Sequence, residues 1–361
     1  MNKTSIEWCN RPETRGPAGA MTWNPIRARL KGQGPKVRSG TFCTRISPGC
    51  THCYASTINK RFGNGLEFTV PNLEQIEFFV DERILEQPLH QKKPCTIFVG
   101  DMFDLFHEAI PEDLIGEVFA VMEQCSQHTF QVLTKRTRRM RDILVAAADT
   151  APQKYRGLLP LPNVWIGTSI EDQQRADERI PLLLETPAAV RFLSVEPMLE
   201  AVRIDECAPY VLDGNESNPG ILNAFTAMVH HPLTVKFAPE RTAKPDGISW
   251  VICGGESGPG ARPMHPSWAR SLRDQCVNAG IPFFFKQWGE WMPHPEPPDR
   301  NGSYHGGIFL LPNGQLGNQV DWWEDRVQAM DRVGKKRAGA ILDGREWREF
   351  PASQKAEVVS A

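Results

Sequence analysis

The fold is decided by a stretch that begins Thr96-Ile97-Phe98-Val99-Gly100-Asp101, a short apolar run ended by a glycine and a carboxylate. Residues 112–126 then carry apolar side chains three or four positions apart, which is typical of an amphipathic helix. Five later apolar runs are similarly short, nearly continuous and bounded by polar residues. These runs are 130–133, 164–166, 190–193, 250–252 and 282–285. Continuous apolar strands that alternate with helices predict βαβ units and a parallel sheet.

This alternation predicts an α/β fold whose sheet is either open or closed into a partial or complete parallel (β/α) barrel. Three stretches rich in Gly, Pro or mixed polar residues do not fit the repeat. The expected segments are an irregular N-terminal arm over 1–42, the barrel over 43–290 with an insertion at about 205–247, and a C-terminal extension over 291–361. The apolar run 76–80 is a further candidate strand.

Composition limits the class of protein. The chain has 361 residues and a net charge of −2, so its bulk charge does not indicate binding to a polyanion. We find no apolar signal-peptide core and no run that approaches the ~18 apolar residues of a membrane span, so a cytoplasmic protein without membrane contact is expected. In a reducing compartment, clustered cysteines indicate metal ligands or catalytic thiols rather than disulfides.

Polar residues or glycines stand directly after each apolar run. In a parallel βα architecture these ends face one side of the sheet, where ligand sites are built. Each residue alone could serve only as a helix cap or turn, but the set predicts a site, because charged side chains there need partners or water. The set comprises Asp101, Lys135, Ser169, Glu171, Ser194, Glu196, Gly254, Gly255, Glu256 and Lys286.

The most specific motif is the loop CTRISPGCTHC, which contains Cys43, Cys50 and Cys53 with six and then two residues between them. Three thiolates on one loop can hold three irons of a [4Fe–4S] cluster and leave the fourth iron open for S-adenosylmethionine. A structural zinc site is one alternative, but it needs a fourth ligand, such as His52 or a distant cysteine. A redox pair of Cys50 and Cys53 is another, and it leaves Cys43 without a role.

With this loop, the chain resembles a phage- and prophage-associated family of three-cysteine-motif proteins of unknown function. The match runs through most of residues 1–351. The motifs that carry it are Trp23-Asn24-Pro25, Cys53-Tyr54-Ala55, Leu133-Thr134-Lys135-Arg136, Trp165-Ile166-Gly167-Thr168-Ser169, Ser194-Val195-Glu196-Pro197, Gly254-Gly255-Glu256-Ser257-Gly258, Phe285-Lys286-Gln287-Trp288-Gly289 and Asp343-Gly344-Arg345-Glu346-Trp347. That family is in turn similar to radical S-adenosylmethionine (radical SAM) enzymes, which implies a barrel of that type with a [4Fe–4S] cluster and S-adenosylmethionine as cofactors.

The resemblance implies a role for each candidate residue. Cys43, Cys50 and Cys53 would bind the cluster, and Tyr54 would pack near the adenine. Further cofactor contacts are expected from Asp101, Ser169, Glu171, Ser194, Gly254 and Gly255. Catalytic or charge-handling roles are expected from Lys135, Glu196, Glu256 and Lys286.

The resemblance also implies a separately encoded partner protein, and a cluster of this kind would need a reductant. The loop departs from the three residues that usually separate the first two cysteines of radical SAM enzymes. A basic stretch, with Arg27, Arg29, Lys31, Lys36 and Arg38, also lies before Cys43. This stretch could contact a phosphate backbone or form a solvated loop, and the basic run 135–141 could do the same or form a solvated first helical turn. Together with the phage association, the two favour a nucleotide or nucleic acid as substrate. The alternatives are a non-catalytic, zinc-stabilised nucleic-acid-binding protein and a degenerate radical fold without chemistry.

Overall fold

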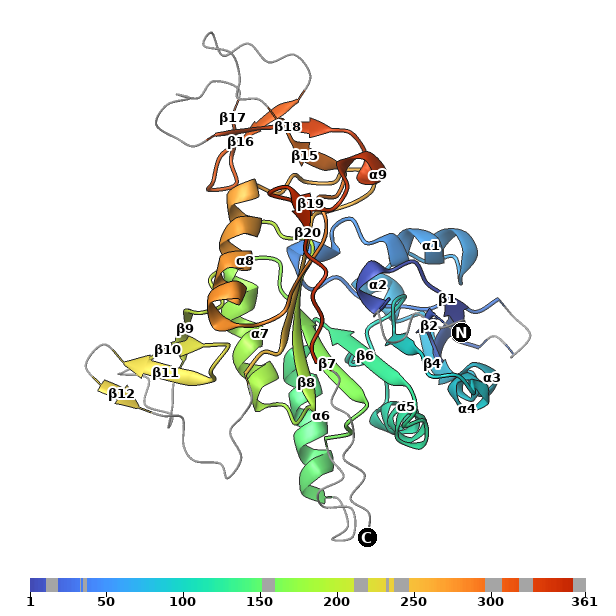
Figure 1. The fold of residues 1–361 in the computed structure, drawn as a ribbon. Coiled ribbons are helices and arrows are strands. Elements are labelled where there is room, and N and C mark those ends of the chain that lie inside the picture. The colour runs from blue at the N-terminus through green and yellow to red at the C-terminus, as the bar shows by residue number, and fades with distance from the viewer. Residues whose placement is uncertain are drawn as a thin grey trace. The chain divides into compact units, whose positions relative to one another are not determined.

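The computed structural model describes residues 1–10, 19–32, 34, 38–150, 160–210, 220–231, 234–236, 247–295, 307–317 and 327–352. The fold is mixed α/β, with a main sheet of eight mostly parallel strands (Figure 1). The chain divides into two compact units. Unit 1 comprises Met1–Thr168, Glu185–Arg191 and Ala352–Ala361, and unit 2 comprises Ser169–Leu184 and Phe192–Pro351. Each unit is described by itself.

Unit 1 contributes five strands to the main sheet, in the order β1-β2-β5-β6-β7. The strands are β1 (Asn2–Lys3), β2 (Ala20–Trp23), β5 (Thr96–Val99), β6 (Thr129–Thr134) and β7 (Val164–Ser169). All neighbouring pairs are parallel except β1 with β2. Every residue of β5 and of β7 is buried, as their continuous apolar character predicts.

The helices of unit 1 follow the predicted alternation. They are α1 (Tyr54–Phe62), α2 (Val70–Leu73), α3 (Glu82–Leu85), α4 (Gln87–His90), α5 (Glu112–Gln124) and α6 (Thr137–Thr150), with short 3₁₀ turns at Glu7–Cys9 and Pro48–Cys50. Helix α5 buries Ile115, Val118, Val121 and Met122, which is the apolar face that the sequence predicts.

The N-terminal arm is more regular than predicted. Strand β2 lies inside the main sheet, where it pairs with β5, and β3 (Ile26–Leu30) pairs antiparallel with β4 (Ile76–Val80). The run 76–80 is therefore a strand, but in a separate two-stranded sheet. Strand β3 has an alternating pattern: Ile26 and Ala28 are buried, whereas Arg27 and Arg29 are half-buried. This alternation is typical of an antiparallel ribbon that buries only one face. Lys36, part of the predicted arm, lies outside the described residues.

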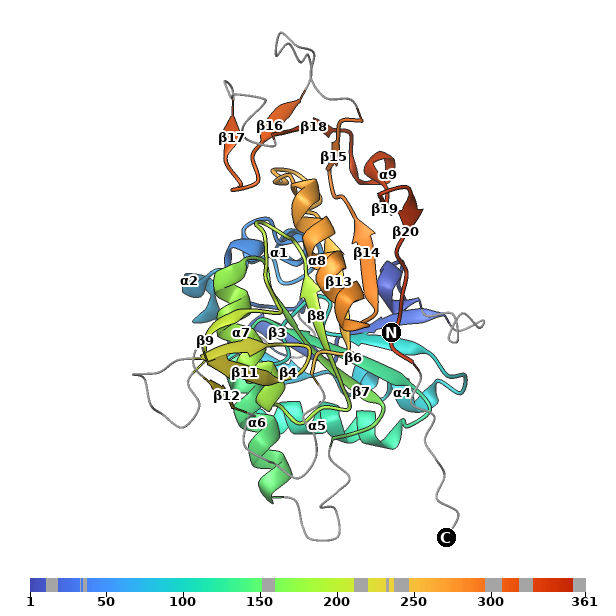
Figure 2. The same cartoon turned by 60° about the vertical axis from the view of Figure 1, so that its left-hand side comes forward.

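Unit 2 contributes β8 (Val190–Val195), β13 (Trp250–Gly254) and β14 (Phe283–Gln287), which are parallel in that order. Helix α8 (Pro266–Ala279) lies beside β14 in both cartoon views (Figures 1 and 2), and the second long helix is α7 (Gln173–Glu185). Helix α8 ends at Gly280, whose φ of 68° places it in the left-handed region. Its N-cap is His265, which accepts a hydrogen bond from the Ser267 N–H.

Three smaller sheets of unit 2 account for the segments that interrupt the repeat. The described part of the insertion is an antiparallel sheet of β9 (Cys207–Tyr210), β10 (Gly220–Asn223), β11 (Met228–His231) and β12 (Thr234–Lys236). The C-terminal extension holds a sheet of β15 (Trp291–Pro293), β16 (Ile308–Leu310), β17 (Leu316–Gly317) and β18 (Gln328–Arg332), then α9 (Lys335–Ala338) and the pair β19 (Ile341–Leu342) and β20 (Arg345–Glu346). Backbone bonds from Phe285 N to Trp347 O (2.9 Å) and from Glu349 N to Phe283 O (3.2 Å) then return the chain to β14.

The six strongest predicted strands all occur in the main sheet, so the α/β class and its parallel strands are confirmed. A complete barrel is not: within the described residues, no strand pairing closes the sheet on itself. None of the helices in the described parts of the chain has the length and apolar character that a membrane-spanning helix requires.

Candidate functional site

The three predicted ligand cysteines lie on one loop of unit 1, between the buried Phe42 and helix α1. Cys50 ends the 3₁₀ turn Pro48–Cys50, where its N–H donates to Ser47 O (2.9 Å). Cys53 occupies the N-cap position of α1. All nine cysteines are free thiols, and these three are half-buried whereas the other six are buried. The loop therefore carries the cysteines that the fold leaves accessible.

Asn59 of α1 holds the two ends of this loop together. Its side-chain oxygen accepts from Thr41 N (3.1 Å), and its amide nitrogen donates to Asn64 Oδ1 (2.7 Å) and Leu66 O (2.8 Å). A Cβ at Gly40 would lie 2.1 Å from the Asn59 Oδ1 atom, so only glycine permits this approach. The start of the loop and the helix after it are thus fixed to each other.

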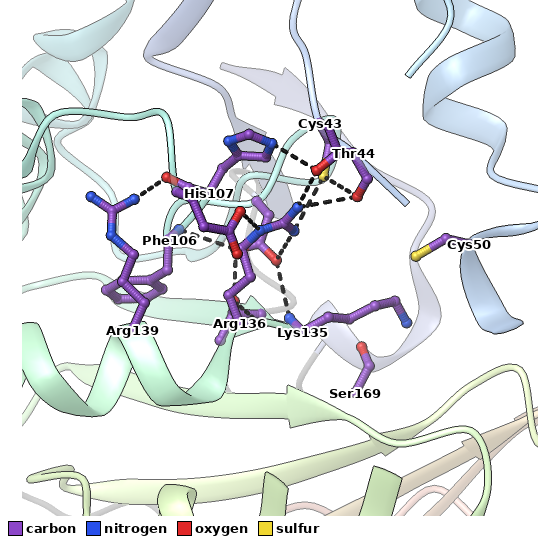
Figure 3. A network of polar contacts seen from close by, with 12 residues as sticks. Cys43, Thr44, Cys50, Phe106, His107, Lys135, Arg136, Arg139 and Ser169 are labelled. Atoms are coloured by element: carbon purple, nitrogen blue, oxygen red, sulfur yellow. Dashed lines mark hydrogen bonds and ion pairs between the residues drawn. The ribbon is translucent and has the colours of Figure 1, made fainter. Parts of the chain in front are cut away.

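Arg136 is the buried anchor of the first cysteine (Figure 3). One guanidinium nitrogen, Nη1, donates to Cys43 Sγ (3.4 Å) and to Asp104 Oδ2 (3.1 Å). The other, Nη2, donates to Thr44 O (3.1 Å) and Thr44 Oγ1 (2.8 Å), and Nε donates to Glu108 Oε2 (2.7 Å). The Arg136 side chain is only 2% exposed. All three guanidinium nitrogens donate hydrogen bonds, so these contacts fix the position of Arg136 beside Cys43.

Asp104 completes this network from the loop after β5. It accepts from Thr134 Oγ1 (2.6 Å), Lys135 N (3.0 Å) and Phe106 N (3.0 Å) in addition to Arg136. Burial alone would raise the pKa of Asp104, but the charge of Arg136 and these hydrogen bonds together lower it. Asp104 is therefore a carboxylate at neutral pH, and it balances the guanidinium charge.

His107 closes the network as a neutral ring. Burial, and after it the charge of Arg136, lowers the pKa of His107 to about 4. Its Nδ1 accepts from Ala109 N (3.1 Å), so the proton sits on Nε2, which donates to Thr44 Oγ1 (3.0 Å). Arg139 donates to the carbonyl oxygens of His107 and Ile110. These contacts make His107 a structural support and not a general base at neutral pH.

Two thiols of the loop, those of Cys43 and Cys53, are protonated at neutral pH because their pKa values are raised. Burial raises the pKa of Cys43 to about 12, against the opposing charge of Arg136. Burial also raises the pKa of Cys53, against the N–H groups of Ser56 and Ala55 and the charge of Lys135. A reactive dithiol needs a lowered pKa, so the redox-pair alternative lacks support from Cys53. Metal binding can still deprotonate such thiols, because a bound cation displaces the proton.

The donor chemistry fits a metal cluster, but the arrangement is not preformed. Three uncrosslinked thiols on one loop are suitable ligands for iron or zinc. Within the described residues, however, no group of three or more His, Cys, Asp or Glu side chains is placed to hold a metal ion. Cys43, Cys50 and Cys53 would therefore have to converge when a metal binds.

The structure brings Tyr54 and Asp101 together, through the Asp101 backbone, and the cofactor contacts predicted for them remain untested. Tyr54 Oη donates to Asp101 O (2.6 Å), and Asn24 Nδ2 donates to Asp101 Oδ1 (2.7 Å). Burial raises the pKa of Asp101, while hydrogen bonds from Asn24 and Thr22 partly offset it. The carboxyl of Asp101 thus already has protein partners, and its contact ties helix α1 to the end of β5.

In unit 2 the structure brings Glu196 and Lys286 into an ion pair at the ends of β8 and β14. Lys286 Nζ donates to Glu196 Oε1 (2.8 Å) and Oε2 (3.1 Å), and the two side chains are 14% and 19% exposed. Gln287 Nε2 donates to Gly255 O (2.9 Å) beside them. A Cβ at Gly254 would lie 3.2 Å from the Glu196 carboxyl, so the glycine lets that carboxylate lie against the β13 backbone.

Four other predicted residues of unit 2 have structural partners. Glu256 accepts from Arg262 Nη2 (2.6 Å), Nε (2.8 Å) and N (2.8 Å), and buried Glu171 accepts from Arg179 Nη1 (3.1 Å). The same Arg179 nitrogen donates to Ser169 O (2.7 Å). Ser194 O accepts from Ile170 N (2.9 Å). The carboxylates of Glu256 and Glu171 are thus committed to arginines, and the predicted ligand contacts at these four positions remain untested.

Sequence reasoning missed the residues that position the loop, namely Asn59, Asp104 and Arg136 in its structural role. Asp104 stands five residues beyond the end of β5 and Arg136 two beyond β6, so both belong to the strand-end pattern. The two residues follow adjacent strands and carry opposite charges, and this could have indicated an ion pair. Asn59 gave none, because its function depends on the close approach of Gly40.

Comparisons with known proteins identify the family and nothing further. Residues 3–351 match the family described as protein of unknown function (DUF5131), and the chain belongs to that family. No curated protein and no solved structure matches the chain.

Proposed function

We propose that this DUF5131 protein is a radical SAM enzyme of the cytoplasm. Cys43, Cys50 and Cys53 would hold three irons of a [4Fe–4S] cluster, and S-adenosylmethionine would bind at the fourth. The chemistry that this cofactor pair supplies is reductive cleavage of a carbon–sulfur bond of S-adenosylmethionine. The phage association, the barrel of the radical SAM type, a separately encoded partner protein and a reductant are parts of the same proposal.

The observation that carries the proposal is the buried guanidinium of Arg136 against Cys43 Sγ. An N–H donor and a positive charge beside a sulfur atom favour its thiolate form, which is the form that ligates iron. A plain structural cysteine needs no such partner, and the six other cysteines are ordinary buried thiols. Arg136 therefore orients the first ligand and offsets its charge, and Asp104 and Thr44 hold Arg136 in place.

The residues after the loop would shape the cofactor side of the site. Tyr54 is 54% exposed although its hydroxyl is bonded to Asp101 O, so its side chain is accessible to a ligand. The charge of Lys135 opposes the rise in the pKa of Cys53 that burial causes. The Lys135 backbone N–H donates to Asp104, which fixes its position. Lys135 would handle charge or contact the substrate at the loop.

In unit 2, Glu196 and Lys286 would act as a proton-transferring or ligand-binding pair, because both are partly exposed while held in a defined geometry. Gly254 and Gly255 would let a ligand approach the backbone. Ser169 and Ser194 would contact the cofactor, and Glu171 and Glu256 would contribute through the arginines that they bind.

The direct test is the product of the proposed cleavage. Protein reconstituted anaerobically with iron and sulfide, then given dithionite and S-adenosylmethionine, is expected to release 5′-deoxyadenosine. The Cys50→Ala variant should release none, while Cys276→Ala, which removes a buried thiol of α8, should behave as the wild type. Cluster assembly without 5′-deoxyadenosine would indicate the degenerate fold. Tightly bound zinc without iron uptake would instead support the zinc-stabilised nucleic-acid-binding module.

A further inference from the structure

The positive charge of the chain is concentrated around the cysteine loop. Residues 14–66 contain no Asp or Glu, although the whole chain has a net charge of −2. The basic residues of this segment are Arg15, Arg27, Arg29, Lys31, Lys36, Arg38, Arg45, Lys60 and Arg61. Arg15 and Lys36 lie outside the described residues. A segment of one sign this long produces a local field that the net charge conceals.

Two exposed arginines of this segment lie near helix α1. Arg38 donates from Nη2 to Arg61 O (2.6 Å) and from Nε to Phe62 O (3.4 Å), which places it at the C-terminal end of the helix. The Arg61 guanidinium lies 4.9 Å from the centre of the Phe62 ring. Glu67 pairs with Lys60 of α1, which lies two residues from Ile58 and therefore on another side of the helix. Arg38 and Arg61 are thus the cations that lie at the C-terminal end of the helix.

The same helix exposes an apolar stripe. Tyr54, Ile58 and Phe62 are 54%, 41% and 65% exposed, and their spacing of four residues places them along one face. Ala55, Ser56 and Asn59 occupy the neighbouring, buried face. The stripe begins next to Cys53 and runs for about 12 Å at 1.5 Å per residue. An aromatic ring at each end of an apolar stripe, bordered by arginines, is an unusual surface to leave in water.

We propose that this surface, the α1 face of Tyr54, Ile58 and Phe62 with Arg38 and Arg61, binds single-stranded nucleic acid. Bases would stack on the rings and on the Arg61–Phe62 pair, and the guanidinium groups would contact phosphates. At 3.4 Å or more per nucleotide, the stripe would cover on the order of three nucleotides. A duplex fits less well, because its bases are stacked inside the helix and cannot reach Tyr54 or Phe62.

An anionic lipid membrane fits this surface less well than a single-stranded nucleic acid does. Membrane binding by a helix requires its apolar face to enter the headgroup and acyl boundary, and the guanidinium over the Phe62 ring would have to enter with it. That the bound strand is also the substrate rests on the proposed function, since the stripe begins at the last ligand cysteine. The binding itself does not depend on a cluster.

The test is fluorescence anisotropy with labelled single-stranded DNA and RNA of about 12 nucleotides, and with a duplex of equal length, using the full chain. Single strands are expected to bind more tightly than the duplex, with affinity that falls as salt rises. Phe62→Ala should weaken binding about tenfold and Phe62→Trp should restore it, because stacking needs a ring. Arg61→Gln should lower the slope of log affinity against log salt by about 0.7.

Two control variants and one vesicle assay make the result decisive. Val70→Ala removes an equally exposed apolar side chain outside the stripe and should leave binding unchanged. Cys43→Ser, Cys50→Ser and Cys53→Ser combined should also bind normally, so that loss of a cluster and loss of binding are separate outcomes. Binding that is absent, that is equal for duplex and single strand, or that is insensitive to Phe62→Ala would overturn the proposal. Phe62-dependent binding to phosphatidylserine vesicles without oligonucleotide binding would assign the surface to membranes.

Discussion

Two ion pairs at strand ends have similar sequence settings and different environments. In unit 1, Arg136 after β6 pairs with Asp104 after β5, and the two side chains are 2% and 9% exposed. In unit 2, Lys286 of β14 pairs with Glu196 after β8, and the two are 14% and 19% exposed. The first pair has no accessible face and supports Cys43, whereas the second can be reached by a ligand. Charged residues at strand ends can therefore differ in burial, and the sequence does not reveal this difference.

The largest expected effect comes from breaking the buried pair. Arg136→Leu should lower the free energy of unfolding by about 3–5 kcal/mol, because it leaves the Asp104 carboxylate buried without a countercharge. Lys286→Leu, the matched change in the open pair, should cost less, about 1–3 kcal/mol, because solvent still reaches the Glu196 carboxylate. Urea denaturation measures both. Equal losses in the two variants would remove the distinction between the pairs.

The second test concerns the backbone beside the open pair. Gly255→Ala should destabilise the protein by about 3 kcal/mol, because the added Cβ would lie 1.9 Å from Trp288 O. Gly116→Ala is the control: nothing lies within 4 Å of its Cβ, and alanine in the interior of α5 should stabilise by about 0.5–1 kcal/mol. Thermal unfolding of the two variants should therefore shift in opposite directions, and a tolerated Gly255→Ala would mean that β14 can move away.

The open pair should matter for activity more than for stability. Glu196→Gln is expected to slow formation of 5′-deoxyadenosine, or turnover once a substrate is known, by about tenfold, equivalent to ~1.4 kcal/mol. Glu256→Gln, which affects a carboxylate bound by Arg262, should mainly reduce stability. Parallel rate and urea measurements separate the two. An unchanged rate in Glu196→Gln would assign the pair to structure.

The smallest expected effect is the change in stability when Asp101 loses its charge, and we compare it with the change at Asp104 in the same loop. Asp101 has a raised pKa in the folded protein, so ionisation costs stability as pH rises from about 4, the value of an unfolded Asp, through the folded pKa. Asp101→Asn should therefore stabilise at pH 7 by up to about 1 kcal/mol, with the gain vanishing in acid. Asp104 has a lowered pKa, so its ionisation stabilises the folded protein instead. This contribution to the free energy of unfolding is present above pH ~4 and is lost as pH falls through the folded pKa. Stability curves of Asp101→Asn and Asp104→Asn against pH that slope the same way would contradict this.

Much of the fold could be predicted, because buried parallel strands have an unambiguous pattern. Residues 96–99 and 250–252 are apolar on both faces, and the structure buries every residue of β5 and β13. Strand β2 was missed because its four residues lie in a Gly- and Arg-rich segment, and its identity depends on pairing with β5. The insertion could be located because the alternation of strands and helices stops there. Its antiparallel sheet could not be predicted from that interruption.

The site was predictable to the level of residue type and not of partner. The spacing of Cys43, Cys50 and Cys53 identified the loop, and the strand ends identified Glu196 and Lys286. Arg136 appeared only as one cation in a basic run, because its contact with Cys43 joins residues 93 positions apart. Glu196 and Glu256 look equivalent in sequence, and only their partners, Lys286 and Arg262, distinguish them.

The central claim is that the three-cysteine loop is a cluster site, and iron and sulfide analysis after anaerobic reconstitution tests it most directly. We expect about four irons and four sulfides per chain, with the electron paramagnetic resonance signal of a reduced [4Fe–4S] cluster, in the wild type and in Cys276→Ala. Cys50→Ala should lose most of the iron and the signal. A Cys50→Ala protein that keeps a full cluster, or a wild type that takes up no iron, would contradict the account.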